Sequence, residues 1–160
     1  MRAMTEGPGL IVGVIPARMG SSRFPGKPLA PINGIPMVGH CYHRAAQAES
    51  LDLTVIATCD QEIVDYAESI GARAIMTSDR HPTASDRAAE AVEVLEAEGL
   101  VVDIVVMIQG DEPLLRPEMV DAAIAPVRAG EAEVSNLIAE MPAEAAPDTN
   151  EIKVVTDEKN

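Results

Sequence analysis

Short apolar runs separated by longer helical patterns are the feature that most constrains the fold of this chain. The apolar runs are rich in apolar residues on both faces, as strands are when both sides of a sheet are covered. They span residues 10–15, 53–58, 72–76 and 103–108. The helical patterns span residues 37–50, 61–70, 85–98 and 117–127. Strands that alternate with helices predict βαβ crossovers, so we expect an α/β fold with a mostly parallel sheet.

Start signals support three of these helices. Asp60 directly precedes the second helix and can cap it, and residues 83–86 (Thr-Ala-Ser-Asp) resemble a capping box for the third. Pro117 stands where a first-turn proline is favoured. We therefore expect these three helices to begin near residues 61, 85 and 117.

The loop after the first strand carries the strongest functional signal. In an open parallel sheet, ligands bind outside the carboxyl ends of the strands. Residues 16–28 follow such an end and contain two Gly, two Ser and the cations Arg18, Arg23 and Lys27. Backbone amides of a Gly- and Ser-rich loop can converge on an anion, while Arg and Lys neutralise its charge. The loop therefore predicts a site for a polyphosphate such as a nucleoside triphosphate.

Two better-known phosphate motifs do not describe this loop. A Walker A loop has four residues between its glycines and ends in Gly-Lys-Ser/Thr. Here five residues separate Gly20 from Gly26, and Pro28 follows Lys27. The Gly-x-Gly-x-x-Gly fingerprint of dinucleotide-binding folds is absent from the sequence. An ordinary surface loop explains the Gly and Ser residues, but it gives no reason for three spaced cations.

The charge distribution also favours a small anionic ligand over a nucleic acid. The formal net charge is −14, which argues against DNA, RNA or an anionic membrane as a partner. With one Phe, two Tyr and no Trp, the chain also lacks the aromatic platforms on which bases stack. Yet no Asp or Glu occurs between Glu6 and Glu49, and four cations lie in that interval. A locally basic segment in an acidic protein indicates a local anion site.

The segment after the fourth strand, Gln109-Gly110-Asp111-Glu112-Pro113, offers a carboxylate at the same edge of the sheet. A carboxylate can hold Mg²⁺, which prefers oxygen ligands and bridges protein to substrate phosphates. Gly110 would let the backbone pass close to a ligand. Gly-Asp-Glu-Pro after a strand is also common as a plain turn, and the residues alone leave both interpretations open.

Other sequence features bear on disulfides, metal sites and cellular location. Cys41 and Cys59 form neither a disulfide framework nor a zinc pattern, and a metal site at His40, Cys41 and His43 lacks a second ligand cluster. No apolar run has the length of a membrane span, and residues 1–9 lack the layout of a signal peptide. We expect a cytoplasmic protein with a tail at residues 1–9 and one nucleotide-binding domain at residues 10–160.

The segment from Val14 through Arg44 closely resembles the 3-deoxy-manno-octulosonate (Kdo) cytidylyltransferases, also called CMP-Kdo synthetases. The resemblance rests on Val-Ile-Pro-Ala-Arg, Ser-Ser-Arg-Phe-Pro-Gly-Lys-Pro-Leu and Ile-Asn-Gly-Ile-Pro-Met, and on Gln-Gly-Asp-Glu-Pro after the fourth strand. It implies a Rossmann-like nucleotidyltransferase fold and Mg²⁺-dependent transfer of CMP from CTP to a 2-keto-3-deoxy sugar acid, with release of pyrophosphate, for lipopolysaccharide biosynthesis. It further implies a homodimer in the full-length form.

The same resemblance assigns roles to individual residues. Arg18, Arg23 and Lys27 would contact the triphosphate, and Asp111 would bind the metal; Arg18, Lys27 and Asp111 are the expected catalytic set. Pro16 and Ala17 would lie under the cytosine ring. The remaining expected nucleotide contacts are Ser21, Ser22, Thr77, Ser85 and Gln109, and the expected contacts to the sugar or the acceptor are His81, Arg87 and Gln109. Ser78 and the Thr-Ala-Ser-Asp at 83–86 depart from the family pattern, which leaves base preference and acceptor open.

The resemblance runs from Leu10 to Thr156 without large gaps. Residues 151–156 have the pattern of a strand, and residues 150–155 match a family strand that continues through a turn into further strands, so we expect a chain that is truncated in its C-terminal part. A natural chain ending in a frayed strand is the alternative. Three other functions also stay open: a nucleotidyltransferase for an acylneuraminate, another sugar or a molybdenum cofactor; a CTP-binding module without turnover; and a purely structural α/β domain.

Overall fold

A single parallel sheet forms the centre of the molecule. The computed structural model describes residues 8–20, 24–145, 147–149 and 153–154. Four strands pair in the order β5-β4-β1-β6, and all three pairings are parallel. The strands are β1 (Leu10–Ala17), β4 (Leu53–Thr58), β5 (Arg73–Met76) and β6 (Val102–Met107). The predicted α/β fold with a mostly parallel sheet is therefore confirmed.

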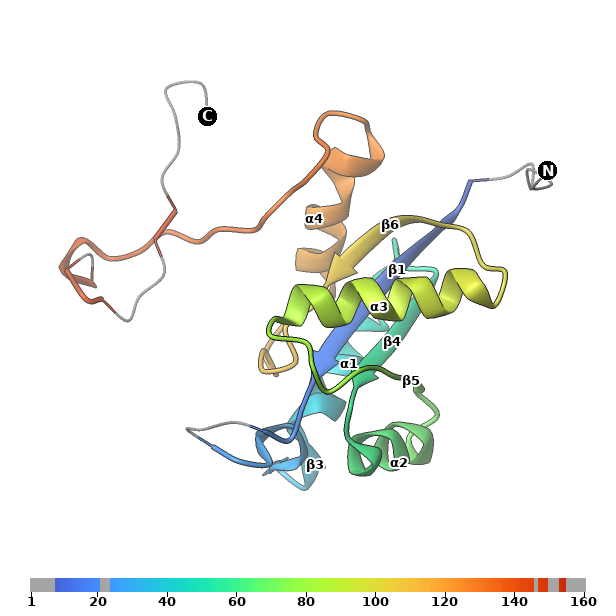
Figure 1. The fold of residues 1–160 in the computed structure, drawn as a ribbon. Helices are drawn as coiled ribbons and strands as arrows, with labels where there is room; N and C mark the ends of the chain where they lie inside the picture. The colour runs from blue at the N-terminus through green and yellow to red at the C-terminus, as the bar shows by residue number, and fades with distance from the viewer. Residues whose placement is uncertain (1–7, 21–23, 146, 150–152, 155–160) are drawn as a thin grey trace.

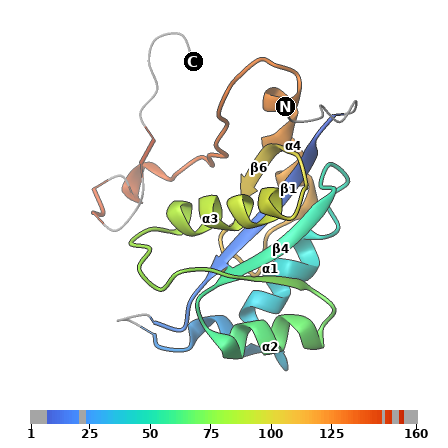
Figure 2. The same cartoon turned by 45° about the vertical axis from the view of Figure 1, so that its right-hand side comes forward.

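Helices cover both faces of the sheet and produce three layers (Figures 1 and 2). They are α1 (Met37–Ala45), α2 (Gln61–Ser69), α3 (Ala84–Ala97) and α4 (Pro117–Arg128). Alternate residues of β1 serve the two faces: Ile11 and Ile15 pack with α1, α2 and α4, whereas Val12 and Val14 pack with α3. This alternation follows from the two-residue period of a strand. None of the described helices is both long and apolar enough to cross a membrane.

The predicted helix boundaries agree with the structure except at α1. The prediction runs to Ser50, but the helix ends at Ala45. The reason is tertiary: the Asp121 carboxylate of α4 accepts hydrogen bonds from the backbone amides of Glu49 and Ser50, at 3.4 and 2.8 Å. Ala48 meanwhile is buried in the core. The backbone amides of Glu49 and Ser50 therefore bond to Asp121 instead of continuing the hydrogen bonds of the helix.

A short hairpin that the sequence analysis did not predict precedes α1. Its strands are β2 (Pro31–Ile32) and β3 (Ile35–Pro36), and their pairing is antiparallel. Asn33 and Gly34 connect them with φ values of +50° and +85°. Two positive φ values in an Asn-Gly pair are the signature of a type I′ turn, which suits a tight hairpin. The 3-10 helix η1 (Lys27–Leu29) leads into this hairpin.

Strand β6 is the edge of the sheet as far as the chain is described, and its two faces are covered unequally. Val102, Ile104 and Val106 are partly buried, whereas Val105 and Met107 are 45% and 40% exposed. Both α3 and α4 contact the strand, so the expected cover on both faces is present, but it is incomplete over Val105 and Met107, which border a groove beside α3. Beyond α4 the described chain, which includes η2 (Ala143–Ala145), runs away from the sheet (Figures 1 and 2).

The predicted strand at residues 151–156 falls mostly outside the described residues. Lys153 and Val154 are described, and neither is in a strand.

Candidate active site

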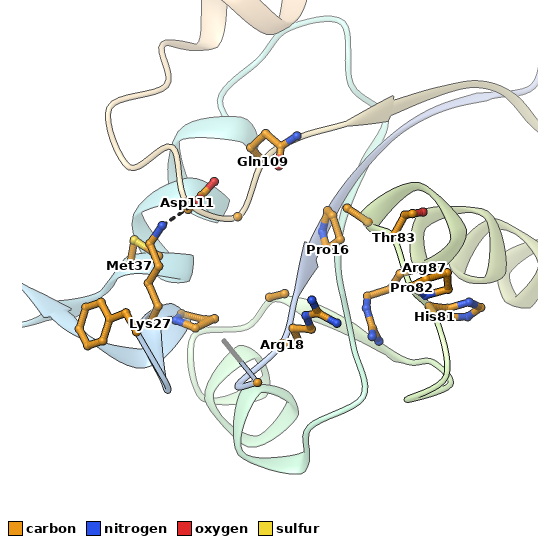
Figure 3. Close-up of a pocket in the computed structure, with 16 residues that line it drawn as sticks. Pro16, Arg18, Lys27, Met37, His81, Pro82, Thr83, Arg87, Gln109 and Asp111 are labelled. Atoms are coloured by element: carbon orange, nitrogen blue, oxygen red, sulfur yellow. Dashed lines mark hydrogen bonds and ion pairs between the residues drawn. The ribbon is translucent and has the colours of Figure 1, made fainter. Parts of the chain in front are cut away.

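An open cavity of about 680 Å³ lies at the carboxyl ends of β1 and β6, where the sheet topology places ligands. Three walls meet there, formed by the loop after β1, the segment after β6 and the start of α3 (Figure 3). The lining residues predicted from the sequence are Pro16, Ala17, Arg18, Lys27, His81, Arg87, Gln109 and Asp111. Segments far apart in the sequence thus converge on one site.

The loop after β1 is anchored by a carboxylate that lies just beyond the neighbouring strand β4, at the start of α2. The Asp60 Oδ2 atom accepts a hydrogen bond from the backbone amide of Met19 at 2.7 Å. Asp60 does occupy the N-cap position of α2, but its side chain makes no capping hydrogen bond. The predicted capping role is therefore wrong, because the carboxylate is used to hold the residue that follows Arg18. Ser21, Ser22 and Arg23 lie outside the described residues.

Lys27 and Asp111 form an ion pair on one side of the cavity (Figure 3). The Lys27 Nζ atom lies 2.7 Å from Asp111 Oδ2, and the two side chains are 37% and 50% exposed. Lys27 is presented by η1, whose preceding residue Gly26 has a φ of +74° and donates its backbone amide to the Met19 carbonyl at 3.0 Å. A cation and an anion that face the same space can receive a phosphate and a metal ion respectively.

Gly110 is required by packing between two strands. A Cβ atom at this position would lie 2.7 Å from the Pro16 carbonyl oxygen, which is a backbone atom and cannot easily move aside. From the sequence, Gly110 is expected to permit a close approach to a ligand. The close approach that the structure shows is between the end of β1 and the segment after β6, and it brings Asp111 near the loop that carries Arg18.

The wall opposite Lys27 and Asp111 is built by the start of α3 and the segment before it. The predicted capping box is confirmed: the Thr83 side chain accepts from the Asp86 amide, and the Asp86 carboxylate accepts from the Thr83 amide. The Arg87 side chain is buried and donates a hydrogen bond to Thr77 Oγ1. His81 contacts Glu90 through its Nε2 atom. Arg87 and His81 both border the cavity (Figure 3).

Two predicted nucleotide contacts lie elsewhere. Thr77 is buried behind Arg87 and does not line the cavity. Ser85 points to the opposite side of α3, where its Oγ atom lies 3.7 Å from the sulfur of Met107 and borders an apolar groove between α3 and β6. Thr77 reaches the cavity lining through its contact with Arg87, and Ser85 lies next to the lining residue Ala84 but faces the groove beside β6.

Phe24 and Met37 line the cavity but were not singled out from the sequence. Phe24 is the one phenylalanine of the chain, and it is 53% exposed beside the cationic loop. The single phenylalanine of the chain, placed between Arg23 and Lys27, was a usable sequence signal for a ligand-facing position. Met37 is the first residue of α1, and its place depends on the unpredicted hairpin, since its amide donates to the Ala30 carbonyl at 3.0 Å.

The donor set fits a metal that is shared with a substrate. Among the described residues, no three His, Cys, Asp or Glu side chains gather into a metal cage. Mg²⁺ commonly takes only one or two carboxylates and completes its shell with water and substrate phosphates. Asp111 supplies one exposed carboxylate at the cavity, with the Gln109 side chain also lining it. These residues are compatible with Mg²⁺ bridging a bound polyphosphate.

The two cysteines serve no metal site in the described structure. Cys41 is fully buried in the core, and burial raises the pKa of its thiol to about 11. The neighbouring His40 uses its Nε2 atom for a hydrogen bond to the Ile32 carbonyl at 2.9 Å. Cys59 is half-buried, and its Sγ atom donates to Asp60 Oδ2 at 3.6 Å.

Comparison with known proteins gives consistent matches. Residues 12–160 match the family model described as cytidylyltransferase. The 3-deoxy-manno-octulosonate cytidylyltransferase of Thermodesulfovibrio yellowstonii is 49% identical over 114 residues, which are 69% of this chain and 45% of that protein. The enzyme of the same name from Nitratidesulfovibrio vulgaris is 43% identical over 149 residues, or 92% of this chain and 58% of that protein.

A solved structure shares the fold of the described residues. It is a CMP:2-keto-3-deoxy-manno-octonic acid synthetase complexed with CTP. The match has a TM-score of 0.69 and 41% identity, and it covers 77% of this chain and 49% of that one. The chain therefore spans about half the length of the relatives that it matches.

Proposed function

This chain belongs to the cytidylyltransferase family, and from that premise we propose that it carries the nucleotide-binding part of a CTP-dependent Kdo cytidylyltransferase. The reaction joins CMP from CTP to the anomeric hydroxyl of 3-deoxy-manno-octulosonate and releases pyrophosphate. The relatives bearing that name support the choice of substrates, as does the CTP in the related solved structure. Such a reaction supplies an activated sugar acid for lipopolysaccharide biosynthesis.

The juxtaposition of Arg18, Lys27 and Asp111 in one cavity is the observation that carries this proposal. A triphosphate brings several negative charges, so it needs cations and convergent amides in its site. Arg18 follows β1, Lys27 belongs to η1, and Asp111 follows β6. A structural α/β domain gives no reason for these three groups to meet at the carboxyl edge of the sheet.

The residues act by positioning and by charge. Arg18 and Lys27 hold the triphosphate, with Arg23 expected to join them, while Pro16 and Ala17 provide the surface under the base. The anomeric oxygen attacks the α-phosphorus in line, and the bond from that phosphorus to the oxygen bridging to the β-phosphate breaks. Lys27 then stabilises the charge that develops on the departing pyrophosphate. This scheme needs no nucleophilic side chain.

Mg²⁺ is the proposed cofactor, and Asp111 is its proposed protein ligand. When bound together with the substrate phosphates, it would neutralise charge on the α-phosphate and the leaving group. Gln109 lies beside Asp111 on the same segment, where it can contact the nucleotide sugar or the acceptor. His81 and Arg87, on the opposite wall, are proposed to contact the nucleotide sugar or the acceptor.

Calorimetric titration of this chain with CTP, UTP, ATP and GTP in the presence of Mg²⁺ tests nucleotide binding. We expect a clear preference for CTP. A folded chain that ignored CTP or preferred GTP would refute the cytidylyltransferase assignment for this site. For the full-length protein, pyrophosphate release with CTP and Kdo, compared with CTP and an acylneuraminate, identifies the acceptor.

A binding module without turnover is the second candidate. It is favoured by one observation: the chain spans about half the length of its relatives. If the chain binds CTP but releases no pyrophosphate when Kdo is present, the residues described here capture the nucleotide without completing the reaction.

We also propose a cytoplasmic homodimer for the full-length protein. Both cysteines are free thiols, which agrees with a reducing compartment. The dimer rests on the family resemblance, and sedimentation of the full-length protein tests it directly.

A further inference from the structure

Glu90 lies outside the cavity but contacts the segment that forms one of its walls. It is on α3, one turn after Arg87, and its Oε2 atom accepts a hydrogen bond from the backbone amide of Ser78 at 2.7 Å. The same oxygen contacts His81 Nε2. One carboxylate thus holds two points of the segment between β5 and α3.

Two neighbouring side chains of α3 share this task. Positions three apart lie on the same face of a helix, so Arg87 and Glu90 both face the segment that begins after β5. Arg87 binds the hydroxyl of Thr77, while Glu90 binds Ser78 and His81. Three residues between the end of β5 and the cavity wall, Thr77, Ser78 and His81, are therefore tied to one helix.

The charge of Glu90 suits this role. The Ser78 amide, and next the hydrogen bond from His81, hold the pKa of the Glu90 carboxyl below its ordinary value. The carboxylate therefore stays ionised at neutral pH. The side chains of His81 and Glu90 are 22% and 30% exposed, so water screens their contact only in part.

We propose that Glu90 is a positioning residue for nucleotide binding, which acts by fixing His81 and the backbone at Ser78 in the orientation that completes the cavity. The inference rests on the proposed function, since the ligand that this wall would contact is the nucleotide. Glu90 itself does not line the cavity. Its effect must therefore pass through His81 and the segment that it holds.

The competing explanation is that Glu90 only stabilises the fold. A residue of that kind would lower the unfolding temperature when replaced, but the folded protein would keep its affinity for CTP. Any loss of affinity that did occur would also be independent of His81. Coupling between the two positions is the property that separates the explanations, and a double-mutant cycle measures it.

The test uses E90A, E90Q, H81A and the double variant E90A/H81A, with E93Q as the matched control. Glu93 is an exposed carboxylate on the same helix, one turn further on. The dissociation constant for CTP with Mg²⁺ is measured by calorimetry, and circular dichroism and thermal unfolding report the folded fraction. E90Q keeps an oxygen that can accept the hydrogen bond from the Ser78 amide. It can therefore be used for the measurement if E90A does not fold.

We expect E90A to weaken CTP binding about tenfold and E90Q to weaken it less, since coupling between contacting residues changes an equilibrium constant by roughly 2- to 150-fold. In the H81A background, the E90A effect should fall to about twofold, and E93Q should bind as the wild type does. The Ser78 amide should exchange its hydrogen faster in E90A. Wild-type affinity in folded E90A and E90Q, or equal effects of E90A with and without His81, would overturn the inference alone. A wild-type chain that does not bind CTP would overturn the proposed function and this inference with it.

Discussion

Replacing Asp111 by Asn should change CTP affinity in opposite directions with and without Mg²⁺. Without a metal, Asp111 pairs with Lys27 and presents a negative charge toward the space proposed for the triphosphate. CTP must then separate this pair and overcome that charge. Asn removes both obstacles, so the metal-free affinity should rise. With Mg²⁺ present, the same change removes the proposed metal ligand, so the affinity should fall.

The size of the metal-free effect follows from the exposure of the pair. At 2.7 Å the Coulomb attraction would be large in a dry interior, but the side chains are 37% and 50% exposed. Exposed ion pairs typically contribute about 0.2–1 kcal/mol. That range corresponds to a rise in CTP affinity of about 1.4- to 5-fold. Loss of the metal ligand should weaken Mg²⁺-dependent binding about tenfold or more. Replacing groups that only hydrogen-bond to a metal ligand already lowers metal affinity or activity by about 10–100-fold.

Calorimetric titration with CTP in EDTA and in Mg²⁺ measures both effects on one preparation. Glu112→Gln is the control, because it removes a charge from the adjacent exposed position, which does not line the cavity. It should give at most a small rise without metal and no loss with metal. Weaker binding of CTP by Asp111→Asn in EDTA, or unchanged binding in Mg²⁺, would refute this account of the Lys27–Asp111 pair.

Three further predictions concern Gly110, Asp60 and Asp121. Gly110→Ala should destabilise the fold by about 1–3 kcal/mol in denaturant unfolding, because the added Cβ would crowd the Pro16 carbonyl. The control Gly20→Ala should leave the stability unchanged, because no atom lies within 4 Å of its added Cβ. Equal stabilities of the two variants would contradict the packing argument. Asp60→Ala should weaken CTP binding several-fold by releasing the Met19 amide, with little change in unfolding temperature, and unaltered affinity would remove Asp60 from the loop anchor. The hydrogen bond from the Ser50 amide is the main cause that lowers the pKa of Asp121 in the folded protein. The Asp121 carboxylate therefore contributes its full stabilisation above pH 3.8, the ordinary pKa, and loses it as the pH falls through the lower pKa of the folded state. The deficit in unfolding free energy of Asp121→Asn should therefore shrink in acid below pH 3.8, whereas a deficit independent of pH would contradict the sign worked out here.

The regular elements were predictable because their signals are local. The apolar runs found the four sheet strands, and the capping box at Thr83 and the proline at position 117 found the starts of α3 and α4. The hairpin before α1 has an equally local signal in Asn33-Gly34, although the predicted elements do not include it. The early end of α1 had none, since it depends on Asp121, which lies 71 residues beyond Ser50.

The site was predictable in its location and less so in its supporting contacts. The rule for parallel sheets and the cations of the first loop placed Arg18, Lys27 and Asp111 at one edge, and the structure brings all three to the cavity. The use of Asp60 could not be read from the sequence, because helix capping and anchoring a loop require the same residue type at the same position. The Asp60 carboxylate bonds to the Met19 amide, a partner that only the folded chain brings within reach.

The unequal burial of the two cysteines makes the loop after β1 accessible to spectroscopy. Cys41 is sealed in the core with a thiol that stays protonated, so a maleimide dye should react at Cys59 alone in the native protein. Cys59 adjoins Asp60, and Asp60 holds Met19. A fluorophore attached there would sit one contact away from the cationic loop, and its emission would report movement of that loop in real time.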